Sequence, residues 1–185
     1  QGAVAQTSCI GCAAGRNAGE VGMGSCTACA GGRYAEDVAQ AACALCVPGR
    51  YSAVESSSCS VCAAGRHDGD VDASTPCADC AIGQYSAAGS LNCTTCVAGQ
   101  ADKDGDPSTE CEACDAGHYA GVGASVCAAC DAGEYDDDGD SSTACGRCSV
   151  GFYSPQASLV CTACPAGYHD NDQDPSTPYD NDAAQ

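Results

Sequence analysis

The sequence predicts a small disulfide-rich repeat, an elongated rod of about ten C-x-x-C modules with short β-hairpins and turns and little helix. The chain of 185 residues holds 20 cysteines, and only 18 residues are Val, Ile, Leu or Phe. That share of large apolar residues is too small for a conventional core, so covalent links must replace one. Gly, Asp, Ser and Pro also interrupt the chain every few residues, which favours turns and short hairpins over amphipathic helices.

The cysteines define an internal repeat. Each of them belongs to a C-x-x-C pair, and the pairs begin at Cys9, Cys26, Cys43, Cys59, Cys77, Cys93, Cys111, Cys127, Cys145 and Cys161. We call the stretch from one pair to the next a module. From Cys43 onward, short modules of 16 residues alternate with long modules of 18. We therefore expect an N-terminal segment at 1–8, two 17-residue modules at 9–42, four 34-residue double repeats at 43–178 and a tail at 179–185.

Two further positions repeat, counted from the second cysteine of each pair. The third is always glycine: Gly15, Gly32, Gly49, Gly65, Gly83, Gly99, Gly117, Gly133, Gly151 and Gly167. This predicts a tight turn with positive φ. The fifth is usually tyrosine, at Tyr34, Tyr51, Tyr85, Tyr119, Tyr135 and Tyr153. An aromatic ring there can lie across a disulfide, and we interpret His67 and His169 as substitutes for it.

The long modules carry aspartate triplets followed by Ser-Thr. The aspartates are Asp68, Asp70, Asp72, Asp102, Asp104, Asp106, Asp136, Asp138, Asp140, Asp170, Asp172 and Asp174. Alternating carboxylates resemble the opening of a calcium loop, although the order of residues is not that of an EF-hand. We therefore expect weak calcium binding, with a solvated acidic turn as the alternative and no other cofactor required.

The net charge is −19, from 25 acidic and 6 basic residues. Nucleic-acid binding depends on Lys and Arg that neutralise phosphates, so this charge excludes that class, and it disfavours an anionic membrane surface. No apolar run reaches the roughly 18 residues of a membrane span. Cations are the natural partners of such a chain.

The cysteine spacing permits either disulfides or metal. The pattern formed by Cys9, Cys12, Cys26 and Cys29 is also that of a structural zinc ribbon. However, the pairs run on without spacers, and their flanks are Ala, Gly and Asp rather than basic or bulky apolar residues. We favour disulfides, and hence an extracellular chain that is secreted or part of a cell-surface appendage. A multi-zinc thiolate protein is the less favoured alternative.

The motif C-x-x-C-x-x-G-x-Y-S, as in CALCVPGRYS and CADCAIGQYS, resembles the ephrin-receptor-like cysteine-rich repeat and, more distantly, tumour-necrosis-factor-receptor modules. Such repeats occur in extracellular surface proteins, including hair proteins of algal flagella. The resemblance implies that each second cysteine pairs with the first cysteine of the next module. The implied bonds are Cys12–Cys26, Cys29–Cys43, Cys46–Cys59, Cys62–Cys77, Cys80–Cys93, Cys96–Cys111, Cys114–Cys127, Cys130–Cys145 and Cys148–Cys161. Each would close a loop of about 14 to 18 residues and contribute roughly 3 kcal/mol.

This ladder leaves out Cys9 and Cys164, and the register places Tyr179 where a further cysteine would stand. An intermolecular bond from Cys164 of one protomer to Cys9 of the next would satisfy both thiols and give a head-to-tail filament. A truncated chain, or a bridge within each terminal C-x-x-C, is the alternative.

Modification is expected at two kinds of position. The one N-x-[ST] sequon is Asn92-Cys93-Thr94. The Ser-Thr pairs are candidate O-glycan sites: Ser74, Thr75, Ser108, Thr109, Ser142, Thr143, Ser176 and Thr177.

These features together favour an extracellular structural glycoprotein that self-associates as the repeat unit of a rod or filamentous surface assembly. A receptor or adhesion ectodomain that binds a protein partner is the alternative. No residue set with catalytic spacing stands out from the repeat, so we do not expect an enzyme.

Overall fold

The computed structural model describes residues 9–168 and 173–177. Within these residues every regular element is a two-residue strand, and no helix is present. The strands form nine antiparallel two-stranded hairpins, each joining one module to the next. They are β1 (Arg16–Asn17) with β2 (Thr27–Ala28), β3 (Arg33–Tyr34) with β4 (Ala44–Leu45), β5 (Arg50–Tyr51) with β6 (Ser60–Val61), β7 (Arg66–His67) with β8 (Ala78–Asp79), β9 (Gln84–Tyr85) with β10 (Thr94–Thr95), β11 (Gln100–Ala101) with β12 (Glu112–Ala113), β13 (His118–Tyr119) with β14 (Ala128–Ala129), β15 (Glu134–Tyr135) with β16 (Gly146–Arg147), and β17 (Phe152–Tyr153) with β18 (Thr162–Ala163).

Each hairpin is fastened by a disulfide beside it. The nine bonds are Cys12–Cys26, Cys29–Cys43, Cys46–Cys59, Cys62–Cys77, Cys80–Cys93, Cys96–Cys111, Cys114–Cys127, Cys130–Cys145 and Cys148–Cys161. These are the pairs that the repeat resemblance implies. A two-stranded hairpin alone is marginally stable in water, so the covalent closure of each loop is what allows such short strands to persist.

The repeated glycine makes the turn that precedes each first strand. Gly49 has φ of 79° and Gly83 has φ of 74°, and the other eight repeated glycines also have positive φ. A second constraint acts at the same two residues. A Cβ on Gly49 would overlap the carbonyl oxygen of Gly89, and one on Gly83 would overlap that of Gly123. The turn of one module therefore packs directly on the backbone of the module after next.

The core consists of sulfur and small side chains. Second cysteines such as Cys29, Cys62 and Cys130 are fully buried. The other recurrent buried position is the sixth after the second cysteine, where Ala35 and Ser154 have no exposed surface. Large apolar residues lie outside: Ile82, for example, is 80% exposed. Disulfides and tight backbone contacts, rather than aliphatic packing, thus hold the modules together.

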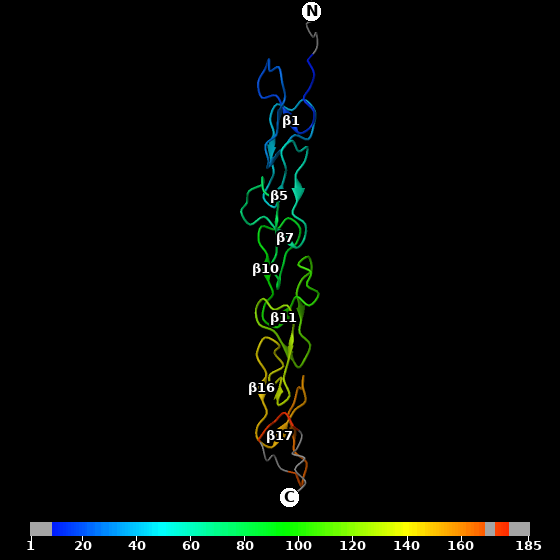
Figure 1. Ribbon diagram of the computed structural model, residues 1–185, viewed down its shortest axis with the longest axis vertical. Coiled ribbons are helices and arrows are strands. Elements are labelled where there is room, and N and C mark those ends of the chain that lie inside the picture. The colour runs from blue at the N-terminus through cyan, green and yellow to red at the C-terminus, as the bar shows by residue number, and fades with distance from the viewer. Residues whose placement is uncertain (1–8, 169–172, 178–185) are drawn as a thin grey trace, which may run out of the picture. The chain divides into compact units, whose positions relative to one another are not determined.

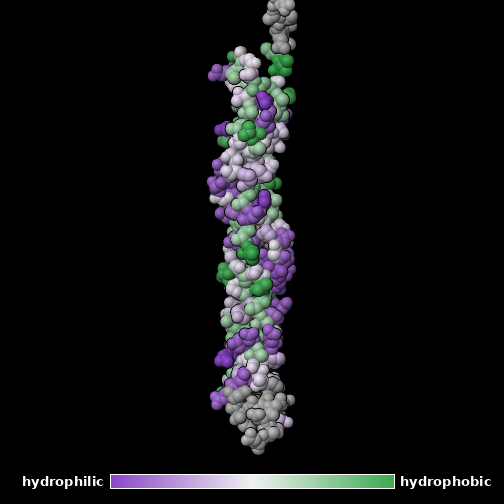
Figure 2. All heavy atoms as spheres, in the orientation of Figure 1, coloured by the Kyte–Doolittle hydropathy of each residue, from purple (hydrophilic) through white to green (hydrophobic). Residues whose placement is uncertain are grey.

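The chain forms two compact units. Unit 1 comprises Gln1–Cys80 and Ser86–Cys93, and unit 2 comprises Ala81–Tyr85 and Thr94–Gln185. Figure 1 shows the short strands spread along the chain between long turns. On the face drawn in Figure 2, hydrophobic and hydrophilic residues are interspersed. The predicted disulfide-rich repeat with short hairpins is confirmed for the described residues.

Candidate functional site

In the three triplets whose first aspartate the structure describes, that aspartate hydrogen-bonds to the module before it. The Asp68 carboxylate accepts a hydrogen bond of 2.9 Å from the backbone N–H of Gly49, and Asp68 is only 5% exposed. Asp102 accepts from the Gly83 N–H at 3.4 Å in the same way. Asp136 repeats the contact with Gly117 at 3.3 Å. These carboxylates therefore satisfy the N–H of the repeated glycine, a role that the sequence analysis did not assign to them.

The second aspartate fixes the exposed loop. The Asp70 carboxylate accepts hydrogen bonds from the Asp72 backbone N–H at 3.0 Å and the Thr75 hydroxyl at 3.0 Å. These two donors hold the pKa of Asp70 below its ordinary value. Asp104 has equivalent donors in Asp106 and Thr109, which lower its pKa likewise. Asp138 accepts from Asp140 N–H and the Thr143 hydroxyl.

The third aspartate caps the turn that follows. Asp72 accepts from the Ser74 N–H at 2.9 Å and from its hydroxyl at 2.7 Å. Asp106, Asp140 and Asp174 each accept from the N–H of the serine two residues later, Ser108, Ser142 and Ser176. The Ser142 hydroxyl and N–H lower the pKa of Asp140. The Ser-Thr pair thus follows each triplet because it supplies the donors that these carboxylates need.

Calcium binding at the triplets stays a prediction. Among the described residues, no three acidic side chains bring their oxygens within 4.8 Å of one another. Each carboxylate is instead hydrogen-bonded within its own loop or to the preceding module. Asp170 and Asp172 of the last triplet lie outside the described residues, as does Tyr179.

The serines of the short modules occupy the sixth position, equivalent to the first aspartate of the long ones. Ser52 is buried, and its hydroxyl donates to the Arg33 carbonyl at 3.0 Å. Ser86 donates to the Arg66 carbonyl at 2.9 Å, and Ser154 to the Glu134 carbonyl at 2.8 Å. This position therefore holds serine in three short modules and aspartate in the described long ones, each bonded backwards to the preceding module. The remaining short module has Ala120 there.

The candidate glycosylation residues lie at the surface with one exception. Asn92 is exposed, as are Ser74, Ser108, Thr109, Ser142, Thr143, Ser176 and Thr177, whereas Thr75 is half-buried. Three of the threonines, Thr75, Thr109 and Thr143, donate their hydroxyl hydrogens to aspartates. A glycan on one of these oxygens would remove that hydrogen. The same holds for Ser74 and Ser142, whose hydroxyls donate to Asp72 and Asp140.

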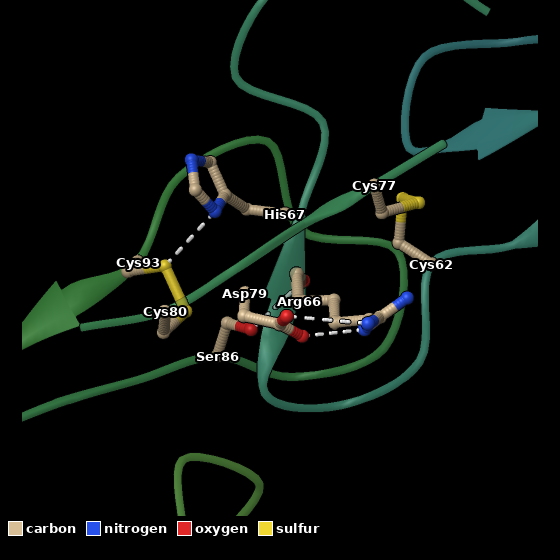
Figure 3. A network of polar contacts seen from close by, with 8 residues as sticks. All are labelled: Cys62, Arg66, His67, Cys77, Asp79, Cys80, Ser86 and Cys93. Atoms are coloured by element: carbon tan, nitrogen blue, oxygen red, sulfur yellow. Dashed lines mark hydrogen bonds and ion pairs between the residues drawn. A yellow bond between two sulfur atoms is a disulfide. The ribbon is translucent and has the colours of Figure 1, made fainter. Parts of the chain in front are cut away.

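One histidine stands against a disulfide. His67 ends β7 at the fifth position, is half-buried, and places Nδ1 at 3.1 Å from Sγ of Cys93, which is bonded to Cys80 (Figure 3). Asn17 occupies the equivalent position in the first module, and its Oδ1 lies 3.4 Å from Sγ of Cys43. In these two modules the fifth-position side chain therefore reaches the first cysteine 26 residues further on. His169 lies outside the described residues.

His67, Cys80 and Cys93 are the one group of three metal-ligand side chains that converge among the described residues. Two of the three ligand atoms are the sulfurs of a single disulfide. A sulfur bonded to another sulfur is not a thiolate, which is the species that binds zinc. In this oxidised state the group is a disulfide with an imidazole beside it. Eighteen cysteines in all form disulfides and are therefore not thiolates.

The two cysteines outside the predicted ladder differ in exposure. Cys9 is an exposed thiol, whereas Cys164 is half-buried and donates its backbone N–H to the Gly151 carbonyl at 3.0 Å. The intermolecular bond between them stays a prediction, as does the expectation that the chain is not an enzyme. None of the described residues forms a helix long and apolar enough to cross a membrane. Comparison with protein-family models and with curated proteins gave no match.

Proposed function

We propose that the chain is an extracellular structural protein, a repeat segment of a filamentous surface assembly. The observation that carries this proposal is the interlocking of each module with its successors. Gly83, for example, packs on the Gly123 backbone, and the second cysteine of each module bonds the first cysteine of the next. Contacts that involve only near neighbours are typical of quasi-one-dimensional repeat proteins.

The composition supports an extracellular setting. Nine disulfides in a chain with so few large apolar residues need an oxidising compartment to form and persist. No buried side-chain nitrogen or oxygen of the described residues lacks a hydrogen-bond partner. A scaffold whose buried polar side chains are all hydrogen-bonded suits a structural role.

Self-association is part of the proposal. The surfaces through which modules pack on one another recur along the chain. A second copy of the chain therefore presents the same surfaces to the modules at the end of the first copy. Heterologous contacts of this kind extend into filaments unless the rotation between copies closes into a ring.

Glycosylation is a separate part of the proposal. Exposed serines and Asn92 would carry glycans on the outside of such an assembly. An intact mass equal to that of the bare 18.1 kDa chain would contradict glycosylation.

Negative-stain electron microscopy of the native, non-reduced protein tests the proposal, with sedimentation velocity on the same sample. We expect filaments whose length grows with concentration. The matched control is reduced and alkylated protein, which loses the ladder and should give no filaments. Monodisperse particles at all concentrations would contradict the assembly and favour the ectodomain.

The ectodomain alternative has one observation in its favour. Tyr34, Leu45, Val47 and Arg50 of unit 1 line an open depression beside the Cys46–Cys59 disulfide, with apolar side chains at its edge. Exposed apolar residues beside an arginine are common at protein interfaces. Binding of the labelled chain to intact cells, lost in Leu45→Asp and kept in Val97→Asp, would support this alternative.

A further inference from the structure

The Cys80–Cys93 disulfide differs from its counterparts in what lies beside it. Four disulfides have the same 13-residue separation, and each begins at the second cysteine of a short, 16-residue module. They are Cys46–Cys59, Cys80–Cys93, Cys114–Cys127 and Cys148–Cys161. The fifth-position residues in register with them are Tyr34, His67, Ala101 and Tyr135. Only the second of these bonds therefore has an imidazole at its side.

The contact places an imidazole nitrogen of His67 next to the sulfur of Cys93, which can act as the leaving group when the disulfide is cleaved. Nδ1 of His67 lies 3.1 Å from Sγ of Cys93. A ring nitrogen that carries hydrogen, in the imidazolium or in one neutral tautomer, donates to a thiolate, and neighbouring His side chains stabilise cysteine thiolates. In thiol–disulfide exchange the better-stabilised thiolate departs faster. Cys93 is therefore the favoured leaving group of this bond.

Among the described residues, His67 is the metal-ligand type side chain that converges with the two sulfurs of this bond. Figure 3 shows the Arg66 guanidinium turned toward Asp79, with Nε at 2.6 Å from Oδ1 of that carboxylate. His67, Gly69 and Pro76 line an open depression, so the ring is reached from solvent. Cys80 and Cys93 are both half-buried, in contrast to the fully buried Cys62 and Cys96.

We propose that Cys80–Cys93 is a thiol–disulfide exchange site that reacts with low-molecular-weight thiols. A thiolate attacks Sγ of Cys80 and forms a mixed disulfide there. The Cys80–Cys93 bond breaks, and its electron pair leaves on Sγ of Cys93, which accepts a hydrogen bond from Nδ1 of His67. No further oxidant or reductant is consumed. The loop that this bond closes comprises residues 81–92, and exchange would open it.

The test uses the full oxidised chain and reduced glutathione. After brief exposure the thiols are trapped by alkylation, and peptide mapping gives the opening rate of each disulfide. We expect Cys80–Cys93 to open about tenfold faster than Cys114–Cys127 or Cys148–Cys161, with glutathione on Cys80 and the alkyl group on Cys93. Equal rates for the three bonds, or glutathione mainly on Cys93, would overturn the proposal.

Two variants separate the imidazole from simple exposure. His67→Tyr places the usual fifth-position residue beside the bond and should lower its opening rate to that of Cys148–Cys161. Tyr135→His makes the reciprocal change and should raise the rate of Cys148–Cys161 about tenfold. Undiminished opening in His67→Tyr, or an unchanged rate in Tyr135→His, would contradict a role for the imidazole.

Discussion

The Asp68 carboxylate accepts a 2.9 Å hydrogen bond from the backbone N–H of Gly49, 19 residues before it. This contact links the exposed acidic loop of a long module to the turn of the preceding short module. The same link recurs between Asp102 and Gly83. The acidic repeat is therefore part of the scaffold as well as a source of negative charge.

Replacing Asp68 should test this link. We expect Asp68→Ala to lower the free energy of unfolding by about 1–3 kcal/mol, because the Gly49 N–H is left buried without an acceptor. Asp68→Asn keeps an acceptor oxygen and should cost less. Guanidinium unfolding under non-reducing conditions measures both variants, and equal losses would show that the carboxyl charge, not the acceptor, matters.

Gly83 should tolerate no side chain. Gly83→Ala combines a left-handed backbone with overlap of the new Cβ and the Gly123 carbonyl, and we expect a loss of roughly 2–4 kcal/mol. Gly105 is the control because it has positive φ but open space around it. Gly105→Ala should lose about 1–2 kcal/mol. Equal losses in the two variants, measured by the same unfolding assay, would rule out the close approach.

The exposed aspartates should make the chain sensitive to strong acid. The folded-state pKa values of Asp70, Asp104 and Asp140 are lowered, so their stabilisation is present above the unfolded-state value of about 3.9 and is lost as pH falls through the lower folded values. When unfolding midpoints are measured at decreasing pH from about pH 5, we expect the midpoint to decrease as the pH falls below about 3.9.

A threonine variant ties this acid loss to one loop. Thr109→Val removes the hydroxyl that donates to Asp104 and should reduce the loss between neutral and acid pH. Thr162→Val, an exposed threonine in β18, is the matched control and should leave the profile unchanged. Identical profiles for both variants would mean that Thr109 does not set the pKa of Asp104.

The sequence predicts much of this fold because its determinants are local and periodic. Cysteine spacing indicated the modules, and the glycine after each pair indicated a positive-φ turn, which the structure confirms at Gly49 and Gly83. The hydrogen bond between Asp68 and Gly49 was not predicted, because the D-x-D-x-D pattern considered within its own module indicates a cation site. The fixed offset from the glycine of the preceding module was the signal that could have revealed it.

The contact of His67 with Cys93 was likewise beyond the sequence analysis. Alignment of the modules showed that His67 replaces tyrosine, and an aromatic ring across a disulfide was expected there. Which sulfur the ring faces depends on how β7 turns relative to a cysteine 26 residues later, and no local pattern encodes that.

Calcium binding remains the prediction for the exposed second and third aspartates. We expect isothermal titration to show weak binding in the millimolar range, typical of extracellular sites, and Asp104→Asn to reduce the number of sites. Magnesium is the control, because it demands a stricter geometry than these loops offer. Absence of heat at millimolar calcium would contradict the prediction.

The central claim is that a ladder of disulfides between modules takes the place of a core. Proteolysis of the native protein without reduction, followed by mass spectrometry of the linked peptides, tests it most directly. We expect nine linkages, each joining the second cysteine of one module to the first of the next, such as Cys62 to Cys77 and Cys96 to Cys111. Bonds within single C-x-x-C pairs, or free thiols that retain zinc, would contradict the account.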